Sequence, residues 1–254
     1  MFVCFLGEEM RNIKLTIEYD GTNFHGWQKQ PDKRTVQEEI ENCLSAILKE
    51  KVNINGAGRT DAGVHAIAQV ANFKTDKTIG AKELYMAINS IISKDVTILN
   101  VEEVPEEFHA RKSAKAKHYR YVVNNSKVHS ALNMNREYVF KYNINDEVIS
   151  MASKDLIGRH DFAAFKAAGS DIEDTVREIY DVSINRIGNR VIIDVIGNGF
   201  MYNMVRIIVG TLLDIGSGKL DVCTIKNMIE TGDRTLGGQT VPACGLYMVE
   251  VLYE

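Results

Sequence analysis

The sequence has few of the residue patterns that build metal sites or disulfide frameworks. Its four cysteines are scattered over 254 residues without a C-x-x-C pair, and its six histidines form no H-E-x-x-H pattern. Structural zinc is usually held by such closely spaced pairs, and small secreted folds by dense cysteines. We therefore expect no metal and no disulfide framework, and we expect Cys43, in an apolar helical pattern, to be a reduced core thiol.

Long hydrophobic runs are also absent. No stretch approaches the roughly 20 apolar residues that a membrane-spanning helix needs. Residues 2–6 are apolar, but they are too few for a signal-peptide core and no basic leader precedes them. We expect a cytoplasmic protein without a membrane partner. Residues 1–9 are expected to be either a leader before a natural start at Met10 or a disordered tail.

Acidic residues are missing from one stretch of a chain that is otherwise acidic. The formal net charge is -4, yet residues 108–136 contain no Asp or Glu. Because the chain is not polybasic as a whole, any nucleic-acid surface must be local. This acid-free stretch is the place for it, and its candidate phosphate contacts are Arg111, Lys112, Lys115 and Lys117.

Two tyrosines in the same stretch share one face of a predicted strand at 117–124. Tyr119 and Tyr121 alternate with Arg120, so both rings lie on one side and the arginine on the other. Aromatic rings beside cations suit stacking on an unpaired base together with phosphate contact. The alternative is an exposed basic strand whose tyrosines pack into the core, and composition does not decide between the two.

The most informative stretch is a glycine-rich loop at residues 56–66, G-A-G-R-T-D-A-G-V-H-A. It places one carboxylate, Asp61, two positions after one cation, Arg59, among small residues that allow close approach. We interpret it as a loop that presents a carboxylate to a substrate. An ordinary Asp-containing turn is the simpler alternative. A dinucleotide-binding loop is disfavoured because the glycine spacing is G-x-G-x-x-x-x-G instead of G-x-G-x-x-G.

The order of the predicted elements indicates an α/β (α+β) protein. The first half reads β-α-β-β-α-β, which is typical of a ferredoxin-like unit, and the second half resembles it loosely. We expect two ferredoxin-like, RRM-like halves with antiparallel sheets, at residues 10–108 with the glycine-rich loop and at residues 109–254. The predicted strands are 13–19, 52–55, 66–73, 96–104, 117–124, 138–142, 176–185, 191–196 and 246–253. The predicted helices are 36–48, 81–92, 146–157, 200–215 and 221–230.

Five motifs, spread over nearly the whole chain, resemble the tRNA pseudouridine synthase A family. They are F-H-G-W-Q at 24–28, the glycine-rich loop, F-H-A-R at 108–111 followed by Y-R-Y at 119–121, the helix motif at 198–210, and T-V-P-A-C-G-L-Y at 240–247 with Asp233-Arg234 before it. His118 departs from the family pattern, in which a basic residue is common at this position.

The resemblance implies a function and a set of roles. The substrate would be uridine at positions 38 to 40 of the tRNA anticodon stem-loop, the protein a homodimer, and the isomerisation free of any cofactor. In a cleft between the halves, Asp61 would be catalytic, Tyr119 would contact the target uridine, Arg206 would face Asp61, Leu246 would form a wall, and Arg59 would support the site. A non-catalytic RNA-binding module and a nucleotide-binding α/β enzyme are the alternatives. Which of the three uridines is modified is beyond the sequence.

Overall fold

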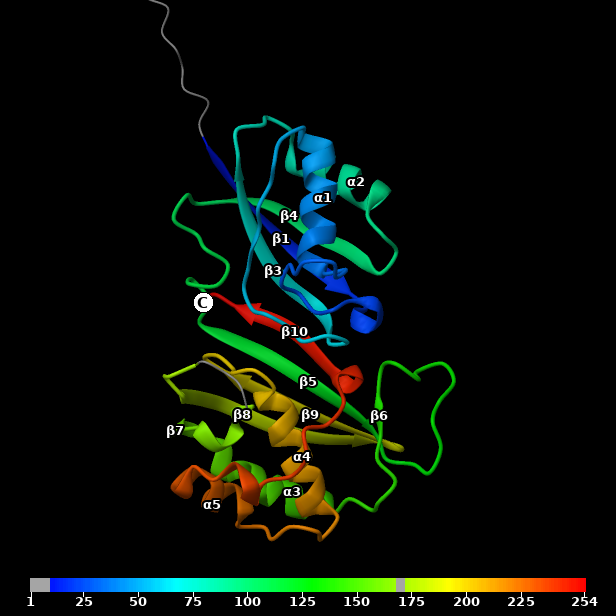
Figure 1. The fold of residues 1–254 in the computed structure, drawn as a ribbon, viewed down its shortest axis with the longest axis vertical. Coiled ribbons are helices and arrows are strands. Elements are labelled where there is room, and N and C mark those ends of the chain that lie inside the picture. The colour runs from blue at the N-terminus through cyan, green and yellow to red at the C-terminus, as the bar shows by residue number, and fades with distance from the viewer. Residues whose placement is uncertain (1–9, 168–171) are drawn as a thin grey trace, which may run out of the picture.

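A computed structural model describes residues 10–167 and 172–254 (Figure 1). The predicted leader, residues 1–9, lies outside the described residues. The first half has the predicted order β-α-β-β-α-β. Its elements are β1 (Arg11–Tyr19), α1 (Val36–Leu48), β2 (Asn55–Gly56), β3 (His65–Thr75), α2 (Ala81–Ile91) and β4 (Val96–Val104).

The second half repeats this order with additions. A short strand follows its first strand, another precedes its second, and two helices instead of one precede its last strand. Its elements are β5 (Ala116–Asn124), β6 (Tyr138–Val139), α3 (Asp146–Ser153), β7 (Gly158–Asp161), β8 (Val176–Ile187), β9 (Arg190–Gly197), α4 (Met204–Gly216), α5 (Thr224–Thr231) and β10 (Leu246–Leu252).

The strands form one sheet in the order β4-β1-β3-β10-β5-β9-β8-β7, with β2 paired to β3 and β6 to β5. Within it the two halves share one pattern, since β4-β1-β3-β2 corresponds strand for strand to β10-β5-β9-β8. The predicted ferredoxin-like α/β class is confirmed. The two sheets are continuous, however, because β10 runs parallel to β3 through the pairs Tyr247–His65 and Met248–Ala66. The boundary near residue 108 stays a prediction.

This junction positions the site. In Figure 1, β10 and β5 cross the middle of the molecule, with α1 and α2 beyond β3 at one end and α3, α4 and α5 at the other. Parallel strands begin at the same edge, so the pairing of Tyr247 with His65 sets the starts of β3 and β10 side by side. The glycine-rich loop leads into β3, and residues 240–245 lead into β10. Two segments remote in sequence therefore meet.

Helix α1 forms as its sequence pattern predicts. The Oγ1 of Thr35 accepts a hydrogen bond from the Glu38 N–H at 3.4 Å, which caps the first turn. Its apolar face is buried against the sheet, apart from the half-buried Ile47. The fully covered residues of that face are Val36, Ile40, Leu44 and Leu48.

Helical spacing predicts Leu84, Ile88 and Ile91 as the buried face of the helix at 81–92, and this prediction is only partly correct. Leu84 and Ile88 are buried, but Ile91 is 57% exposed. Helix α2 ends at Ile91, and Ile92, in extended conformation, packs against the core in its place. Helical periodicity ceases to predict which side is buried once the chain leaves the helix.

The helix predicted at 200–215 begins four residues later, at Met204. Asn203 has φ +60°, in the left-handed region, so a right-handed helix cannot continue through it. The helix predicted at 221–230 begins at Thr224, because Asp221 accepts a hydrogen bond from the Cys223 N–H at 2.9 Å and forms a turn before the helix.

Three further predicted elements are shorter than expected. The strand predicted at 52–55 is only β2, and that predicted at 138–142 is only β6. The helix predicted at 146–157 is α-helical to Ser153 and continues as one 3₁₀ turn. Strands β8 and β9, predicted at 176–185 and 191–196, form a hairpin with its turn at Gly188 in the left-handed region. Across the described ranges 10–167 and 172–254, no helix combines the length and the apolar character required to traverse a bilayer.

Candidate active site

The loop that carries Asp61 is fixed by the chain around Trp27. The Trp27 N–H donates to the Thr60 carbonyl at 3.0 Å, and the Gly63 N–H donates to the Phe24 carbonyl at 3.3 Å. Gly26 has φ +86°, and a Cβ there would lie 2.6 Å from the Thr60 oxygen. Only glycine allows this approach. The F-H-G-W-Q motif therefore packs against the glycine-rich loop and holds its backbone in place.

The single tryptophan also fixes the start of the loop. The Trp27 ring is 2% exposed and lies against Gly56, where a Cβ would come within 2.5 Å of the indole nitrogen. Residues of β1 and β3 contact the loop as well. The Tyr19 hydroxyl is 2.7 Å from the Thr60 hydroxyl, and Gln69 Nε2 donates to the Gly58 carbonyl at 3.0 Å. These buried contacts hold the backbone on both sides of Asp61.

Arg206 faces Asp61 from the first turn of α4. Its Nη1 lies 3.3 Å from Asp61 Oδ2 and donates to Asn203 Oδ1 at 2.6 Å. Its Nε donates to the Val241 carbonyl at 2.7 Å. The contact expected between Arg206 and Asp61 is thus present across 145 positions of sequence. Three hydrogen-bond acceptors therefore fix the orientation of the Arg206 guanidinium.

Two glycines bring the segment before β10 against α4. A Cβ on Gly210 would lie 1.8 Å from the Gln239 carbonyl oxygen, and one on Gly238 would lie 2.6 Å from the Gly210 oxygen. Backbone therefore packs on backbone, and Val241 reaches Arg206. The glycine of the helix motif is explained by this close approach.

Burial and the arginine act on Asp61 in opposite directions. Burial raises the pKa of Asp61 and outweighs the charge and hydrogen bond of Arg206, which lower it. The two side chains remain 18% and 16% exposed, respectively, so the carboxylate is accessible from one side. This arrangement yields a shielded carboxylate with raised basicity and a fixed cation beside it.

Asp61 opens into a cavity of about 500 Å³, here called the Asp61 cavity. Its walls come from the glycine-rich loop, β5, the turn before α4 and the start of β10. Within the described ranges 10–167 and 172–254, Asp61 is the only acidic residue of this lining. The lining residues are Gly58, Arg59, Thr60, Asp61, Val64, Arg111, Lys117, Tyr119, Ile172, Phe200, Met201, Tyr202, Asn203, Val205 and Leu246.

Tyr119 forms one wall of this cavity, with the ring of Phe200 edge-on at 5.2 Å between centroids. Burial, with smaller contributions from Tyr19 and Asp61, raises the pKa of Tyr119, so its hydroxyl keeps its proton and is a hydrogen-bond donor. Tyr121 is fully buried and donates to the Pro242 carbonyl at 2.7 Å. Of the two tyrosines on this face, only Tyr119 is therefore placed to meet a ligand.

The basic residues predicted from the acid-free stretch separate into different environments. Lys117 lies in the Asp61 cavity, where burial, together with the charges of Arg111 and Arg177, lowers the pKa of Lys117 to about 8. Arg111 lines the same cavity, and Lys112 lines a second cavity next to it. Lys115 is exposed and borders neither of these two cavities.

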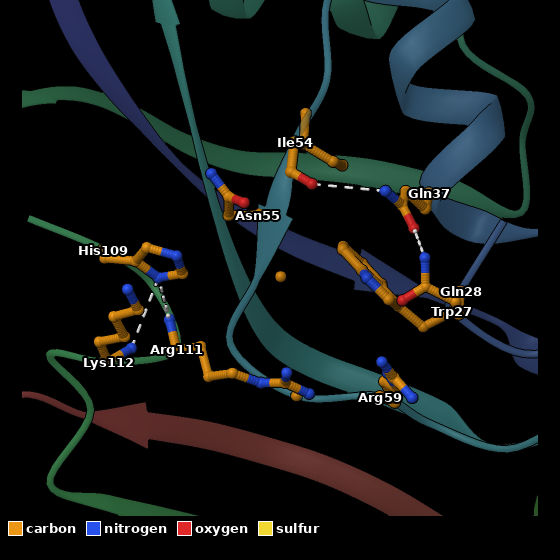
Figure 2. Close-up of a pocket in the computed structure, with 11 residues that line it drawn as sticks. Trp27, Gln28, Gln37, Ile54, Asn55, Arg59, His109, Arg111 and Lys112 are labelled. Atoms are coloured by element: carbon orange, nitrogen blue, oxygen red, sulfur yellow. Dashed lines mark hydrogen bonds between the residues drawn. The ribbon is translucent and has the colours of Figure 1, made fainter.

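Arg59 and Arg111 also line a second cavity of about 290 Å³, here called the Trp27 pocket, which shares Gly58 with the first. Figure 2 shows His109, Arg111 and Lys112 on one side of it and Trp27, Gln28 and Gln37 on the other. No sequence motif predicts this pocket, since its walls come from segments that are far apart in the chain.

Several residues of the site escaped the sequence analysis. Trp27 was noted only as part of a motif, and Asn203 and Val241 were given no role in orienting Arg206. Lys117 was predicted as a phosphate contact but not as part of the cavity, although it alternates with Tyr119 at the period of two that puts both on one face of β5. Among the described residues no group of three or more His, Cys, Asp or Glu side chains could hold a metal ion.

With this geometry in place, comparison with known proteins shows the class of protein. A family model described as tRNA pseudouridine synthase matches residues 15–111 and 152–254. The chain belongs to that family and is an isomerase. The matched stretches include Asp61, Arg206 and Leu246, whereas Tyr119 and Lys117 lie between them.

Individual relatives are similar over nearly the full chain. Proteins named tRNA pseudouridine synthase A from Ruminiclostridium cellulolyticum, Clostridium acetobutylicum and Acetivibrio thermocellus are 50%, 45% and 47% identical. Each alignment covers 96% of this chain and 100% of the relative. A chain in a crystal structure of a Cbf5-Nop10-Gar1 complex aligns over 92% of this chain and 57% of that one, with 12% identity and a TM-score of 0.39. A likeness this low carries no argument.

Proposed function

We propose that this enzyme isomerises uridine to pseudouridine at positions 38, 39 and/or 40 of the tRNA anticodon stem-loop, with Asp61 as the catalytic residue and without a cofactor. One observation carries the proposal. Among the residues that the structure describes, Asp61 is the only acidic one lining a cavity of about 500 Å³, and Arg206 lies 3.3 Å from its carboxylate. A single shielded carboxylate is what an isomerisation at one sugar carbon requires.

The reaction itself needs no external reagent. The N1–C1′ bond of uridine breaks, the base turns within the site, and C5 bonds to C1′. The proton on C5 leaves and N1 gains a proton, so atoms and electrons balance. A carboxylate serves this reaction either as a nucleophile toward the sugar or base, or as the base that removes a ribose proton.

The remaining residues of the cavity position and shield the reacting groups. Arg206 orients Asp61 and stabilises its ionised form, while Leu246 forms an apolar wall that excludes water. The Tyr119 hydroxyl donates a hydrogen bond to the uridine. Extraction of the target base from its stack costs a few kcal/mol, and Arg59, exposed at the rim of the cavity, fills the vacated space.

The tRNA backbone contacts the basic residues that surround this cavity, chiefly Arg111, Lys112 and Lys117, with Lys115 further out. We include in the proposal that the enzyme acts in the cytoplasm as a homodimer that binds one tRNA with both subunits. Light scattering of the pure protein, alone and with one equivalent of tRNA, tests the dimer. A monomer in both measurements would remove that part of the proposal.

The test of the chemistry is Asp61→Asn, which keeps the shape of the side chain and removes its charge, basicity and nucleophilicity. We expect an unchanged fold, tRNA binding as tight as before or tighter, and a loss of several orders of magnitude in single-turnover pseudouridine formation. The matched control is Asp181→Asn, because Asp181 is exposed on β8.

The outcomes separate the proposed function from its alternatives. A non-catalytic RNA-binding module would bind tRNA and form no pseudouridine even as the wild-type protein. Near-normal turnover by a folded Asp61→Asn variant would show that the chemistry lies on another residue. Mapping of pseudouridine in tRNA from cells that lack the protein identifies which of the three positions it modifies.

A further inference from the structure

The Trp27 pocket has no part in the proposed chemistry, yet its lining is that of a ligand site. Its volume of about 290 Å³ is at the lower end of the range for small-molecule pockets. The lining residues are Trp27, Gln28, Gln37, Ile54, Asn55, Gly56, Gly58, Arg59, His109, Arg111 and Lys112.

The charge of this lining suits an anion. It includes Arg59, Arg111 and Lys112, and none of the described residues that line the pocket is an Asp or Glu. The backbone N–H groups of Arg111 and Lys112 donate to His109 Nδ1 at 3.1 and 3.5 Å, which leaves His109 Nε2 as an N–H donor (Figure 2). Each of these four side chains can donate hydrogen bonds to phosphate oxygens.

The rest of the lining includes side-chain amide groups without partners among the described residues. Gln37 Nε2 donates to Glu41 Oε1 at 2.9 Å, and Gln37 Oε1 accepts from Gln28 Nε2 at 2.8 Å, so Gln37 is satisfied within the protein. The Asn55 side chain and Gln28 Oε1 have no hydrogen-bond partner in the part of the chain that the structure describes. Side-chain amides pair with the edges of nucleobases, since they both donate and accept.

The two cavities adjoin. Gly58, Arg59 and Arg111 line both of them, so a strand that fills the Asp61 cavity reaches the Trp27 pocket across the two arginines. We propose that the Trp27 pocket is a second nucleotide subsite, which holds a nucleotide adjacent to the target uridine in the same RNA strand. The linking phosphate lies against Arg59 and Arg111, and the base meets Asn55 and Gln28. This subsite rests on the function proposed for the Asp61 cavity.

The test pairs a protein variant with an altered RNA. Single-turnover pseudouridine formation and tRNA affinity are measured for wild type and Asn55→Ala, on tRNA transcripts in which the nucleotide 5′ or 3′ of the target uridine is abasic. For one of these neighbours we expect each change alone to weaken binding about 3- to 10-fold. The two changes together should cost no more than the larger one, because both remove the same contact.

A second variant reports on the charge of the pocket. Asn55→Asp places a carboxylate among the cations, so thermal stability should be unchanged or higher while tRNA binding falls more than for Asn55→Ala. A residue with a merely structural role would not lower affinity while stability holds. The matched controls are Asn100→Ala and Asn100→Asp, because Asn100 is exposed on β4 and bonded to Glu102.

The outcomes distinguish failure of the subsite from failure of the function proposed for the Asp61 cavity. If wild type forms pseudouridine, but Asn55→Ala and both abasic neighbours act independently or without effect, the subsite is refuted and the proposed function stands. If wild type forms no pseudouridine in any tRNA, the proposed function fails, and the subsite fails with it.

Discussion

Replacement of Arg206 by glutamine tests the electrostatic design of the site. The change removes a guanidinium that lies 3.3 Å from Asp61 Oδ2 and is held by the Val241 carbonyl at 2.7 Å and by Asn203 Oδ1 at 2.6 Å. The shorter glutamine amide carries no charge. Asp61 then remains in its cavity without the cation that offsets its burial.

The size of the effect follows from the geometry. Two unit charges 3.3 Å apart attract by about 5 kcal/mol at an effective dielectric constant of ~20. Since Asp61 and Arg206 are 18% and 16% exposed, solvent weakens this attraction. We expect a coupling energy of ~2–3 kcal/mol, which corresponds to a rate loss of up to roughly 30- to 150-fold on the acid side of the pH profile, where Asp61 must first lose its proton.

The assay is single-turnover pseudouridine formation as a function of pH. Without the cation the pKa of Asp61 rises further, so less of it is ionised at a given pH. The acid limb of the profile should therefore move to higher pH, and alkaline conditions should restore part of the rate. Arg206→Lys keeps the charge and should keep the limb nearer to that of wild type. Arg186→Gln, which removes a surface ion pair to Asp146, is the control.

Two results would refute this reasoning. One is an acid limb that is identical in Arg206→Gln and wild type. The other is a double-mutant cycle of Asp61→Asn and Arg206→Gln in urea unfolding that shows no coupling energy. Either would mean that the ion pair does not control the charge of the carboxylate.

The remaining predictions concern the cations and one glycine. Because burial lowers the pKa of Lys117 to about 8, tRNA affinity should fall as the pH rises through 8, and Lys117→Arg should abolish this fall; binding at pH 7 and 9 measures it. Arg111→Gln and Lys112→Gln should each flatten the dependence of log K on log salt by roughly 0.7 to 0.9, and Lys115→Gln, further from the cavity, should flatten it less. Gly210→Ala should lower the free energy of unfolding by ~1–3 kcal/mol, because the new Cβ meets backbone; a variant as stable as wild type in urea would contradict the close approach.

Local structure could largely be predicted from the sequence. Periodicity predicted α1 and the strands of both halves, since hydrophobic spacing records which face of an element is buried. Asp61 could be predicted as the functional carboxylate because few other segments combine an acidic residue with so many small residues. The resemblance to the family added the contact between Arg206 and Asp61, which no local pattern could predict across 145 positions.

Tertiary contacts decided the points on which the sequence failed. Helix α4 begins late because Asn203 adopts a left-handed conformation and accepts a hydrogen bond from Arg206. This conformation depends on the contacts of the site and not on local helix propensity. Ile91 is exposed because the chain leaves α2 directly after it. Local patterns carry no information about either event.

The sequence by itself determined the family motifs, the α/β class and the identity of the one carboxylate loop, because these depend on residue type and short-range spacing. Only the tertiary structure decided how the halves join, through the pairing of Tyr247 with His65, and so which remote segments surround Asp61. It also separated Lys117, half-buried in the lining of the Asp61 cavity, from Lys115, a residue of the same type at the surface. The physical reason is that burial and the electrostatic field at a site are sums over neighbours in space, which the order of residues does not specify.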